Sequence, residues 1–299
     1  MRIEISFVAL ASIAALAVVC AHARTRGAAP ASGASAGERG PTTRPYWFTD
    51  KGRNAEGFQV YEAESPWHAG KTRLRILLPD RMDKDKRYRV MYVLPVEASD
   101  GRLYGDGLAE VRKLDLHNRH KLICVQPGFS HVPWYADHPT DHQKWQESYF
   151  VKLVLPFIER TCPALAEPRG RLLLGFSKSG WGAWSLLLRH PKVFGKAVAW
   201  DAPLVKARPD QFGMGEIFGT QENFEKYRIT ALLARQAGRL GKTERLALLG
   251  YGNFRDHHLA VRKQLLALKL PHRYADGPQR KHHWSGGWVA EAVEFLAGK

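Results

Sequence analysis

A serine held between small residues is the most informative chemical feature of the sequence. The segment Arg171–Gly182 passes from an apolar run through Gly175-Phe-Ser177 into a helical pattern that contains glycine. A strand, a sharp turn and a helix in this order form a nucleophile elbow, which holds a serine hydroxyl on a strained turn. Gly175 supplies the small residue needed before the serine, and Ser179 replaces the usual second glycine. The pattern predicts that Ser177 is a nucleophile.

A serine hydroxyl is a weak nucleophile and needs a base to accept its proton. His282 stands 105 positions after Ser177, immediately before the last helical pattern of the chain. We predict that His282 is this base. The neighbouring His283 is the alternative, and only His282 has a tryptophan two residues later, at Trp284.

The base in turn needs a carboxylate to orient it. Asp256 follows the apolar run Arg245–Tyr251 and precedes a helix, so we predict that it is the acid. An Asp at a helix start can also serve only as a cap. The alternatives are Asp201, directly after the run that ends at Trp200, and Asp276, six residues before His282.

Short apolar runs that alternate with helical patterns predict the elements that position these residues. Apolar residues recur at helical spacing in 151–158, 181–188 and 289–296. Buried strands separated by helices indicate an α/β protein with a mainly parallel central sheet and helices on both faces. The predicted strands are Thr72–Leu78, Arg89–Leu94, Lys121–Gln126, Arg171–Phe176, Lys196–Trp200 and Arg245–Tyr251.

Two long segments, Pro127–Lys144 and Ala202–Arg228, do not fit this alternation. Long loops after strands are common sites of function in α/β folds. In the first segment we predict that Trp134 and Tyr135 line a substrate cleft and stack on a sugar or an aromatic acyl group. The alternative is that they anchor the loop to the core. The His and Asp residues nearby match no metal-binding spacing, so no metal is predicted.

These motifs resemble the α/β-hydrolase superfamily, and within it the putative esterase group that includes esterase D-like, feruloyl esterase-like and mycolyltransferase-like proteins. The resemblance covers about residues 58–297. It rests on the elbow Gly175–Gly182, the strand Val90–Leu94 with its following turn, and His282-His-Trp284 before the last helix. With Pro133–Pro139, the elbow also resembles a branch of bacterial exported hydrolases.

The resemblance implies an oxyanion hole made of two backbone N–H groups. We expect one from Lys178, after the nucleophile, and one from Glu97 in the turn Pro95-Val96-Glu97. Related enzymes often carry His-Gly at this turn. A carboxylate here disfavours negative charge unless its side chain points away.

The composition fits a globular protein and excludes several classes of function. Of the 299 residues, 44% are hydrophobic and 25% are charged, with a formal net charge of +16. The basic residues are scattered and form no nucleic-acid-binding motif, so we predict no nucleic acid partner. The chain has neither a Walker A loop nor a GxGxxG motif with its acidic partner, and no cofactor is predicted.

The N-terminus predicts export. Met1-Arg2, the apolar run Ile5–Cys20 and Ala21-His22-Ala23 together indicate a signal peptide, residues 1–23. The composition of residues 24–45 is typical of a flexible linker, and residues 46–299 are predicted to form a single domain. We therefore expect a periplasmic or extracellular protein with no integral membrane segment after cleavage. Cys124 and Cys162 could pair in an exported protein, but their positions favour two separate thiols.

Taken together, the residues predict an exported serine esterase that works through an acyl-enzyme on a small-molecule or carbohydrate ester. The altered turn at Pro95-Val96-Glu97 favours one alternative, a non-catalytic binding module on a hydrolase scaffold. Acyl transfer to a sugar acceptor, which uses the same residues, is another. The sequence does not specify the acyl group, the alcohol or the oligomeric state.

Overall fold

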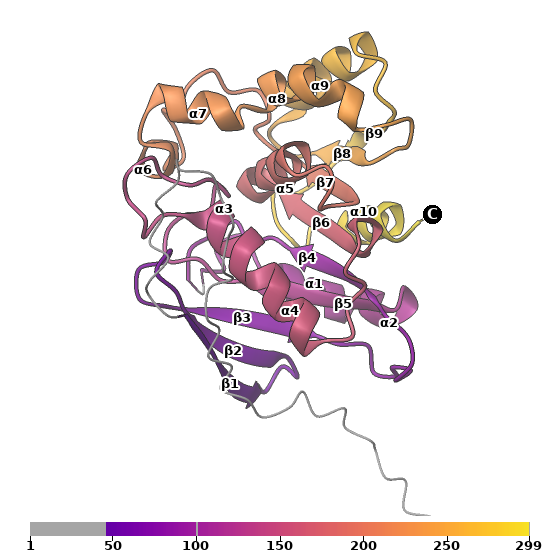
Figure 1. The fold of residues 1–299 in the computed structure, drawn as a ribbon. Helices are drawn as coiled ribbons and strands as arrows, with labels where there is room; N and C mark the ends of the chain where they lie inside the picture. The colour runs from indigo at the N-terminus through magenta and orange to yellow at the C-terminus, as the bar shows by residue number, and fades with distance from the viewer. Residues whose placement is uncertain (1–45, 100, 299) are drawn as a thin grey trace, which may run out of the picture.

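The central feature of the computed structural model is a sheet of nine strands (Figure 1). The structure describes residues 46–99 and 101–298, so the predicted signal peptide and linker lie outside the described residues. The strand order is β1-β2-β3-β5-β4-β6-β7-β8-β9. The strands are β1 (Trp47–Arg53), β2 (Gln59–Glu64), β3 (Lys71–Leu77), β4 (Arg89–Val93), β5 (Leu122–Pro127), β6 (Arg171–Phe176), β7 (Lys196–Trp200), β8 (Leu246–Tyr251) and β9 (His272–Gln279).

Strand direction divides the sheet into two parts. The pairs β1·β2, β2·β3 and β3·β5 are antiparallel, and every later pair is parallel. The six predicted strands correspond to β3–β8 with ends within about one residue. Strands β1, β2 and β9 were not predicted because they contain few consecutive apolar residues. The mixed composition of β9 agrees with its burial, since it has no fully buried position. Buried central strands give the clearest sequence signal because both of their faces are covered.

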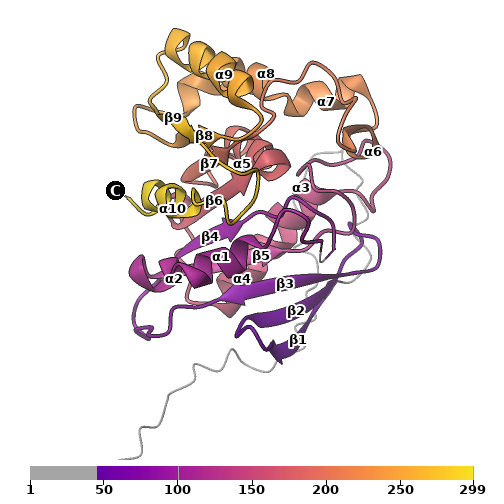
Figure 2. The same cartoon turned by 180° about the vertical axis from the view of Figure 1, so that it is seen from behind.

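Helices cover both faces of the sheet, as predicted (Figures 1 and 2). On one face lie α1 (Gly107–Lys113), α2 (Leu116–Arg119) and α10 (Val289–Ala297). On the other lie α3 (Gln146–Tyr149), the π-helical turn η1 (Phe150–Val154), α4 (Leu155–Thr161), α5 (Ser177–Arg189), α8 (Ile229–Gln236) and α9 (Arg255–Ala267). Two hydrophobic clusters, one under each helix layer, make up the core.

The two segments that did not fit the alternation have different structures. Within 202–228 lie two short helices, α6 (Met214–Phe218) and α7 (Gln221–Tyr227), whereas 128–144 has no helix or strand. The remaining short elements are the 3₁₀ turns η2 (Pro168–Gly170) and η3 (Ala237–Arg239). Both segments begin at the carboxyl end of a strand, so both reach the edge of the sheet where Ser177 lies.

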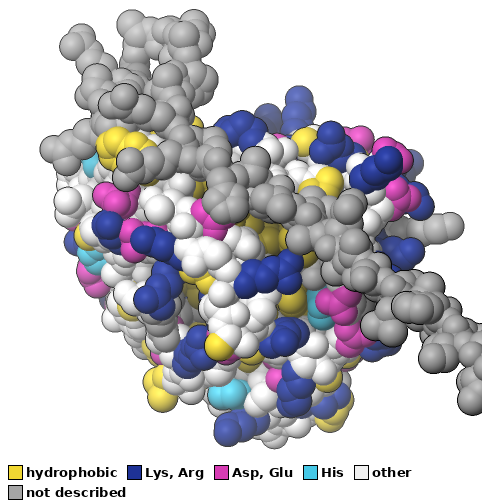
Figure 3. Space-filling model, turned by 90° about the horizontal axis from the view of Figure 1, so that it is seen from below, with side chains coloured by type: hydrophobic (Ala, Val, Ile, Leu, Met, Phe, Trp, Pro, Cys, Tyr) yellow, Lys and Arg dark blue, Asp and Glu magenta, His cyan; other side chains and the backbone are white. Residues whose placement is uncertain are grey.

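The charged side chains on one face of the domain show no single focus. On the face seen in Figure 3, Lys and Arg side chains lie singly or in small groups among acidic ones. None of the helices in the described part of the chain combines the length and apolarity needed to cross a membrane. Cys124 and Cys162 are both buried, and no disulfide joins them.

Helix α5 packs so closely on the segment before α3 that Gly182 has no room for a side chain. A Cβ on Gly182 would lie 2.0 Å from Cδ2 of Tyr135. We predict that Gly182→Ala lowers the free energy of unfolding by about 1–3 kcal/mol, the usual cost of overpacking, and lowers Tm by several degrees. Chemical and thermal unfolding measure both quantities.

Gly238→Ala is the matched control for this substitution. Gly238 lies in η3, and a Cβ added there would have no atom of the described residues beyond its own turn within 4 Å. The added methyl group meets open space, so the free energy of unfolding should fall by less than about 0.5 kcal/mol. Equal losses in the two variants would contradict the packing argument.

Candidate active site

Ser177 occupies the sharp turn between β6 and α5 in the strained conformation of a nucleophile elbow. Its φ is +51°, in the left-handed region that costs free energy for a residue with a Cβ. A Cβ on Gly175 would lie 2.2 Å from the carbonyl oxygen of Ser179. One on Gly180 would lie 2.9 Å from Cβ of Ala202. These small residues allow the strand and the helix to approach closely enough to form the turn.

Ser179 has a structural role inside the elbow. Its side chain is fully buried. Its hydroxyl accepts a hydrogen bond from the amide of Phe176 at 3.1 Å and donates one to the carbonyl of Phe176 at 2.9 Å. Both hydrogen-bonding functions of Ser179 are therefore engaged, and Ser177 is the serine left available for chemistry.

His282 reaches a carboxylate that directly follows β7, at the carboxyl edge of the sheet. Its Nδ1 lies 2.5 Å from Oδ2 of Asp201, which directly follows β7. The Asp201 side chain is fully buried and that of His282 is 15% exposed. Because Nδ1 faces the carboxylate, Nε2 is the nitrogen left to exchange a proton with another group.

The turn after β8 forms a cradle of amides around Asp201. Asp201 Oδ1 accepts hydrogen bonds from the amides of Asn253 at 2.8 Å and Phe254 at 2.7 Å. A Cβ on Gly252 would lie 2.6 Å from Oδ2, so only glycine permits this close approach. Burial by itself raises the pKa of Asp201, but the hydrogen bonds from His282 and from the amides of Gly252, Phe254 and Asn253 outweigh this effect and hold the pKa below its usual value.

The pairing of Asp256 with His282 that the sequence predicted is wrong. Asp256 is exposed in the first turn of α9, and the carboxylate against His282 is Asp201. The other alternative, Asp276, forms an ion pair with Arg255 at 2.6 Å. The physical reason is that the loop after β8 turns its amides toward the Asp201 carboxylate, while its own carboxylate, Asp256, stays exposed at the start of α9.

Aromatic rings enclose His282 on several sides. The ring centroids of Phe176, Tyr104 and Phe254 lie 5.0, 5.5 and 5.8 Å from that of the imidazole, all edge to face. These contacts restrict both the ring orientation and the access of water. Within the described residues no hydrogen bond of 3.5 Å or less joins Ser177 to His282, and such bonds are often long before substrate binds.

His283 points away from this cluster. Its Nδ1 accepts a hydrogen bond from the amide of Ser285 at 3.1 Å and contacts the Ser285 hydroxyl at 2.8 Å. Its backbone carbonyl accepts from Nε1 of Trp288 at 3.0 Å, and Trp284 beside it is almost fully buried. The buried tryptophans fix the His-His-Trp segment so that His282, and not His283, faces Asp201.

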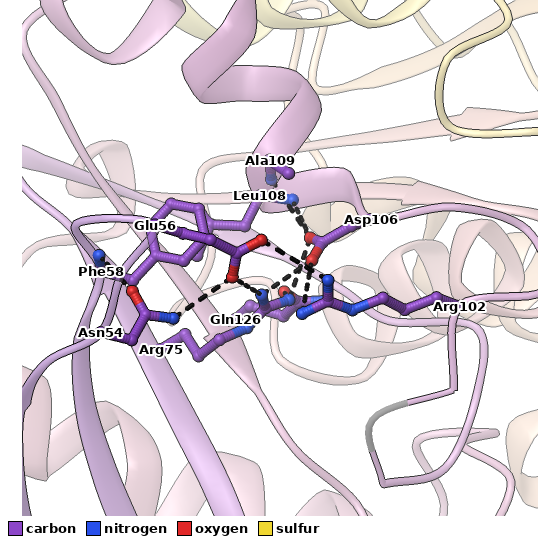
Figure 4. A network of polar contacts seen from close by, with 9 residues as sticks. All are labelled: Asn54, Glu56, Phe58, Arg75, Arg102, Asp106, Leu108, Ala109 and Gln126. Atoms are coloured by element: carbon purple, nitrogen blue, oxygen red, sulfur yellow. Dashed lines mark hydrogen bonds and ion pairs between the residues drawn. The ribbon is translucent and has the colours of Figure 1, made fainter.

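A polar network anchors residues 101–106, which include Tyr104 (Figure 4). Asp106 caps α1 by accepting from the amides of Leu108 and Ala109 at 3.0 and 3.1 Å. Arg75 of β3 binds the same carboxylate with two hydrogen bonds, at 2.7 and 2.9 Å, and also contacts Gln126 of β5. This bidentate pair ties the end of the segment to the sheet.

The turn expected to supply the oxyanion hole lies beside the elbow and is held by Tyr135. The Tyr135 hydroxyl donates a hydrogen bond to the carbonyl of Pro95 at 2.7 Å. Glu97 Oε2 accepts from the amide of Tyr104 at 3.3 Å, so its carboxylate is turned toward that segment. Lys178 lies in the first turn of α5, where amides have no partner within the helix. Burial lowers the pKa of the Lys178 ammonium group, with the charge of Glu97 acting in the opposite direction.

Trp134 and Tyr135 do not line a cleft, which corrects the prediction that they stack on substrate. Both side chains are fully buried. Nε1 of Trp134 donates to the carbonyl of Phe212 at 3.1 Å, and its ring packs on Trp181. They anchor the loop, as the alternative held, and Tyr135 also supports the turn at Pro95.

Sequence reasoning missed several residues of the site. Tyr104 and Phe254 contact the imidazole of His282, and Gly252 makes room for the carboxylate. Gly252-Asn253 directly after a predicted strand is a turn signal that could have indicated a set of free amides there. No comparable signal marks Tyr104, because its position depends on the anchoring of residues 101–106.

The sheet order, the elbow after β6 and the carboxylate and histidine at the same edge define an α/β-hydrolase fold. The model of the family described as Putative esterase matches residues 65–246, more than half of the chain. The chain belongs to this family.

Individual relatives agree with this assignment. Esterase MT1326 and Esterase Rv1288 of Mycobacterium tuberculosis are each 28% identical to the chain over 141 residues, or 46% of this chain and 30% of the relative. The match therefore spans less than a third of these relatives.

Solved structures share the fold at low identity. The S-formylglutathione hydrolase FrmB of Staphylococcus aureus has a TM-score of 0.65 at 18% identity, covering 81% of this chain and 98% of that one. A ferulic acid esterase has a TM-score of 0.62 at 20% identity, covering 80% of this chain and 95% of the esterase chain. MPT51 (FbpC1) of Mycobacterium tuberculosis has a TM-score of 0.58 at 13% identity, covering 80% and 96%.

The hydrogen bonds that the amides after β8 donate to Asp201 predict that this carboxylate stabilises the fold in a pH-dependent way. Because its folded-state pKa is held below the ordinary value of 3.8, the contribution is present above that pH and is lost as the pH falls through the folded-state pKa. The difference in unfolding free energy between wild type and Asp201→Asn should therefore be larger at pH 6 than at pH 3. Urea unfolding at the two pH values measures it.

The matched control is Asp256→Asn, which changes an exposed carboxylate outside the cradle. It should alter the unfolding free energy by less than about 0.5 kcal/mol at pH 6. An Asp201→Asn difference that is the same at both pH values would mean that the amides do not stabilise the charge.

Proposed function

We propose that this protein is a carboxylic ester hydrolase with Ser177 as nucleophile, His282 as base and Asp201 as the orienting acid. The observation that carries the proposal is the 2.5 Å contact between Asp201 Oδ2 and His282 Nδ1, at the edge of the sheet where Ser177 occupies its strained elbow. Membership of the Putative esterase family supports the reaction class.

In the proposed reaction Ser177 Oγ attacks the ester carbonyl carbon while Nε2 of His282 takes the hydroxyl proton. The imidazolium then gives this proton to the alkoxide oxygen, so that the alcohol leaves and an acyl-enzyme remains. Water, deprotonated by the same Nε2, releases the acid and restores the serine. Asp201 stays ionised throughout, because its cradle of amides and the imidazolium both favour the charged form.

The oxyanion formed at each step needs two donors. We assign them to the amide of Lys178, at the positive end of the α5 dipole, and to the amide of Glu97 in the turn fixed by Tyr135. The Glu97 carboxylate hydrogen-bonds the amide of Tyr104, which supports a turn that donates its own N–H despite the acidic side chain.

We also propose that the protein is exported. The support is the basic start, the apolar run and the Ala21-His22-Ala23 site at the N-terminus. N-terminal sequencing of the protein recovered outside the cytoplasm tests this, and a mature chain that begins at Arg24 is the expected result. An intact N-terminus in that fraction would contradict cleavage at Ala23.

Covalent labelling tests the choice of nucleophile. A fluorophosphonate should phosphonylate Ser177 with loss of fluoride, and Ser177→Ala should abolish both labelling and turnover, with a loss of about 10⁶-fold in kcat. Mass spectrometry of the labelled peptide locates the group. Ser179→Ala should still be labelled, because the Ser179 hydroxyl is buried and bonded to Phe176. Labelling of Ser179 in the wild type would overturn the assignment.

Paired substitutions test the base and the acid. His282→Ala should approach the loss seen for Ser177→Ala, whereas His283→Ala should keep kcat within about tenfold. Asp201→Asn should lower kcat by about 10³–10⁴-fold because it removes the carboxylate that stabilises the imidazolium, and Asp256→Asn should change it little. Kinetics on acetate esters measure all four variants. A reversed ranking of the two Asp variants would restore Asp256 as the acid.

A further inference from the structure

Most of the large apolar side chains that the described residues expose belong to segments that also contribute to the candidate site. Among residues 46–99 and 101–298, the large hydrophobic side chains exposed to solvent are Leu103, Val205, Phe212 and Leu266. Leu103 precedes Tyr104, which contacts His282, and Val205 lies four residues after Asp201. Only Leu266, near the end of α9, belongs to another region. Exposed apolar side chains on the segments of a site indicate a ligand with an apolar part.

Phe212 is the aromatic residue among these four, and its backbone is strained. The residue is 50% exposed, yet its φ is +56°, a conformation that is unfavourable for an aromatic residue. The hydrogen bond from Trp134 Nε1 to its carbonyl holds the backbone in place. A half-exposed ring contributes little to the core, so the core does not explain why this strained conformation is kept. We take the strain as a sign that the Phe212 ring has a role in binding.

A row of rings connects Phe212 with the base. The ring centroids of Phe212 and Phe254 are 6.2 Å apart, with the rings edge to face. The ring centroids of Phe254 and His282 are 5.8 Å apart. The Lys206 ammonium group lies 5.0 Å from the Phe212 centroid and so covers part of the ring. The row forms a continuous apolar path from the solvent to the imidazole.

Because Phe212 and Phe254 extend from His282, the proposed reaction determines which part of an ester substrate they would contact. In the proposed reaction the imidazolium donates its proton to the departing alkoxide, so the alcohol part must lie beside His282. The carbonyl oxygen must instead face the amides of Lys178 and Glu97. We infer that Phe212 and Phe254 bind the alcohol part of the substrate, and that this part is apolar. The inference rests on the proposed function and names the substrate class of the same site.

Two series of simple esters separate the alcohol subsite from the acyl subsite. In the first, acetate is joined to ethanol, 1-butanol or 1-hexanol, alcohols of similar acidity. In the second, ethanol is joined to acetate, butyrate or hexanoate. For the wild type, kcat/KM should rise along the alcohol series by up to about fourfold per methylene, the full value of burying one. Phe212→Ser should flatten this rise and leave the rise along the acyl series as it is in the wild type.

Two further variants serve as controls. Phe212→Leu keeps an apolar side chain and should retain at least half of the wild-type slope, expressed as the logarithm of kcat/KM per methylene. Leu266→Ser removes an exposed apolar side chain near the end of α9, away from Phe212 and Phe254. This variant should match the wild type on every ester.

The outcomes distinguish this inference from the proposed function. An unchanged alcohol slope in Phe212→Ser, or a loss of the acyl slope instead, overturns the assignment of the subsite while the esterase stands. The assignment is overturned as well if kcat/KM of the wild type does not rise along the alcohol series. If the wild type neither turns over any ester nor reacts with a fluorophosphonate at Ser177, the proposed function fails and the inference fails with it.

Discussion

The candidate site depends on a buried carboxylate that remains ionised. Removing Asp201 from water costs free energy, and the structure offsets this cost with amides from the turn after β8 and with the imidazole of His282. This arrangement fixes three separate parts of the chain relative to one another: the end of β7, the turn after β8 and the loop before α10. A change in any one of them alters the orientation of the His282 imidazole.

The elbow imposes a second constraint, which is one of space rather than charge. Helix α5 can follow β6 through so tight a turn only if the residues at the contact are small, and Gly175 and Gly180 meet that need. Ser179 fits where a second glycine is usual because its hydroxyl turns back to the Phe176 backbone and is satisfied there. The same close packing continues to Gly182, which accommodates the ring of Tyr135. Tyr135 in turn reaches the turn at Pro95, so the packing of α5 and the expected oxyanion hole are mechanically linked.

The surroundings of the imidazole come from loops that the sheet brings together. The segment 101–106, held by the Arg75–Asp106 pair, contributes Tyr104, and the turn after β8 contributes Phe254. Phe212 extends this apolar wall to the solvent from a loop that begins directly after Asp201. The residues that orient the base and those that we assign to substrate recognition therefore share the same short segments, and selection for one role constrains the other.

The sequence by itself determined the class of fold, the nucleophile elbow at Ser177 and the histidine segment before α10. These features are local: a buried parallel strand is a continuous apolar run, and an elbow is a strand, a turn and a helix in direct succession. Edge strands such as β9 carry mixed patterns and were not predictable in this way.

Only the tertiary structure decided which carboxylate meets His282 and what Trp134 and Tyr135 do. Asp201 and Asp256 both follow strands and look equivalent along the chain, but the choice depends on which loop turns amides inward and which turns a side chain inward. Likewise, an aromatic pair in a loop can face a ligand or the core, and nothing within the loop distinguishes the two. Each outcome is set by contacts between residues tens of positions apart, which a local pattern does not encode.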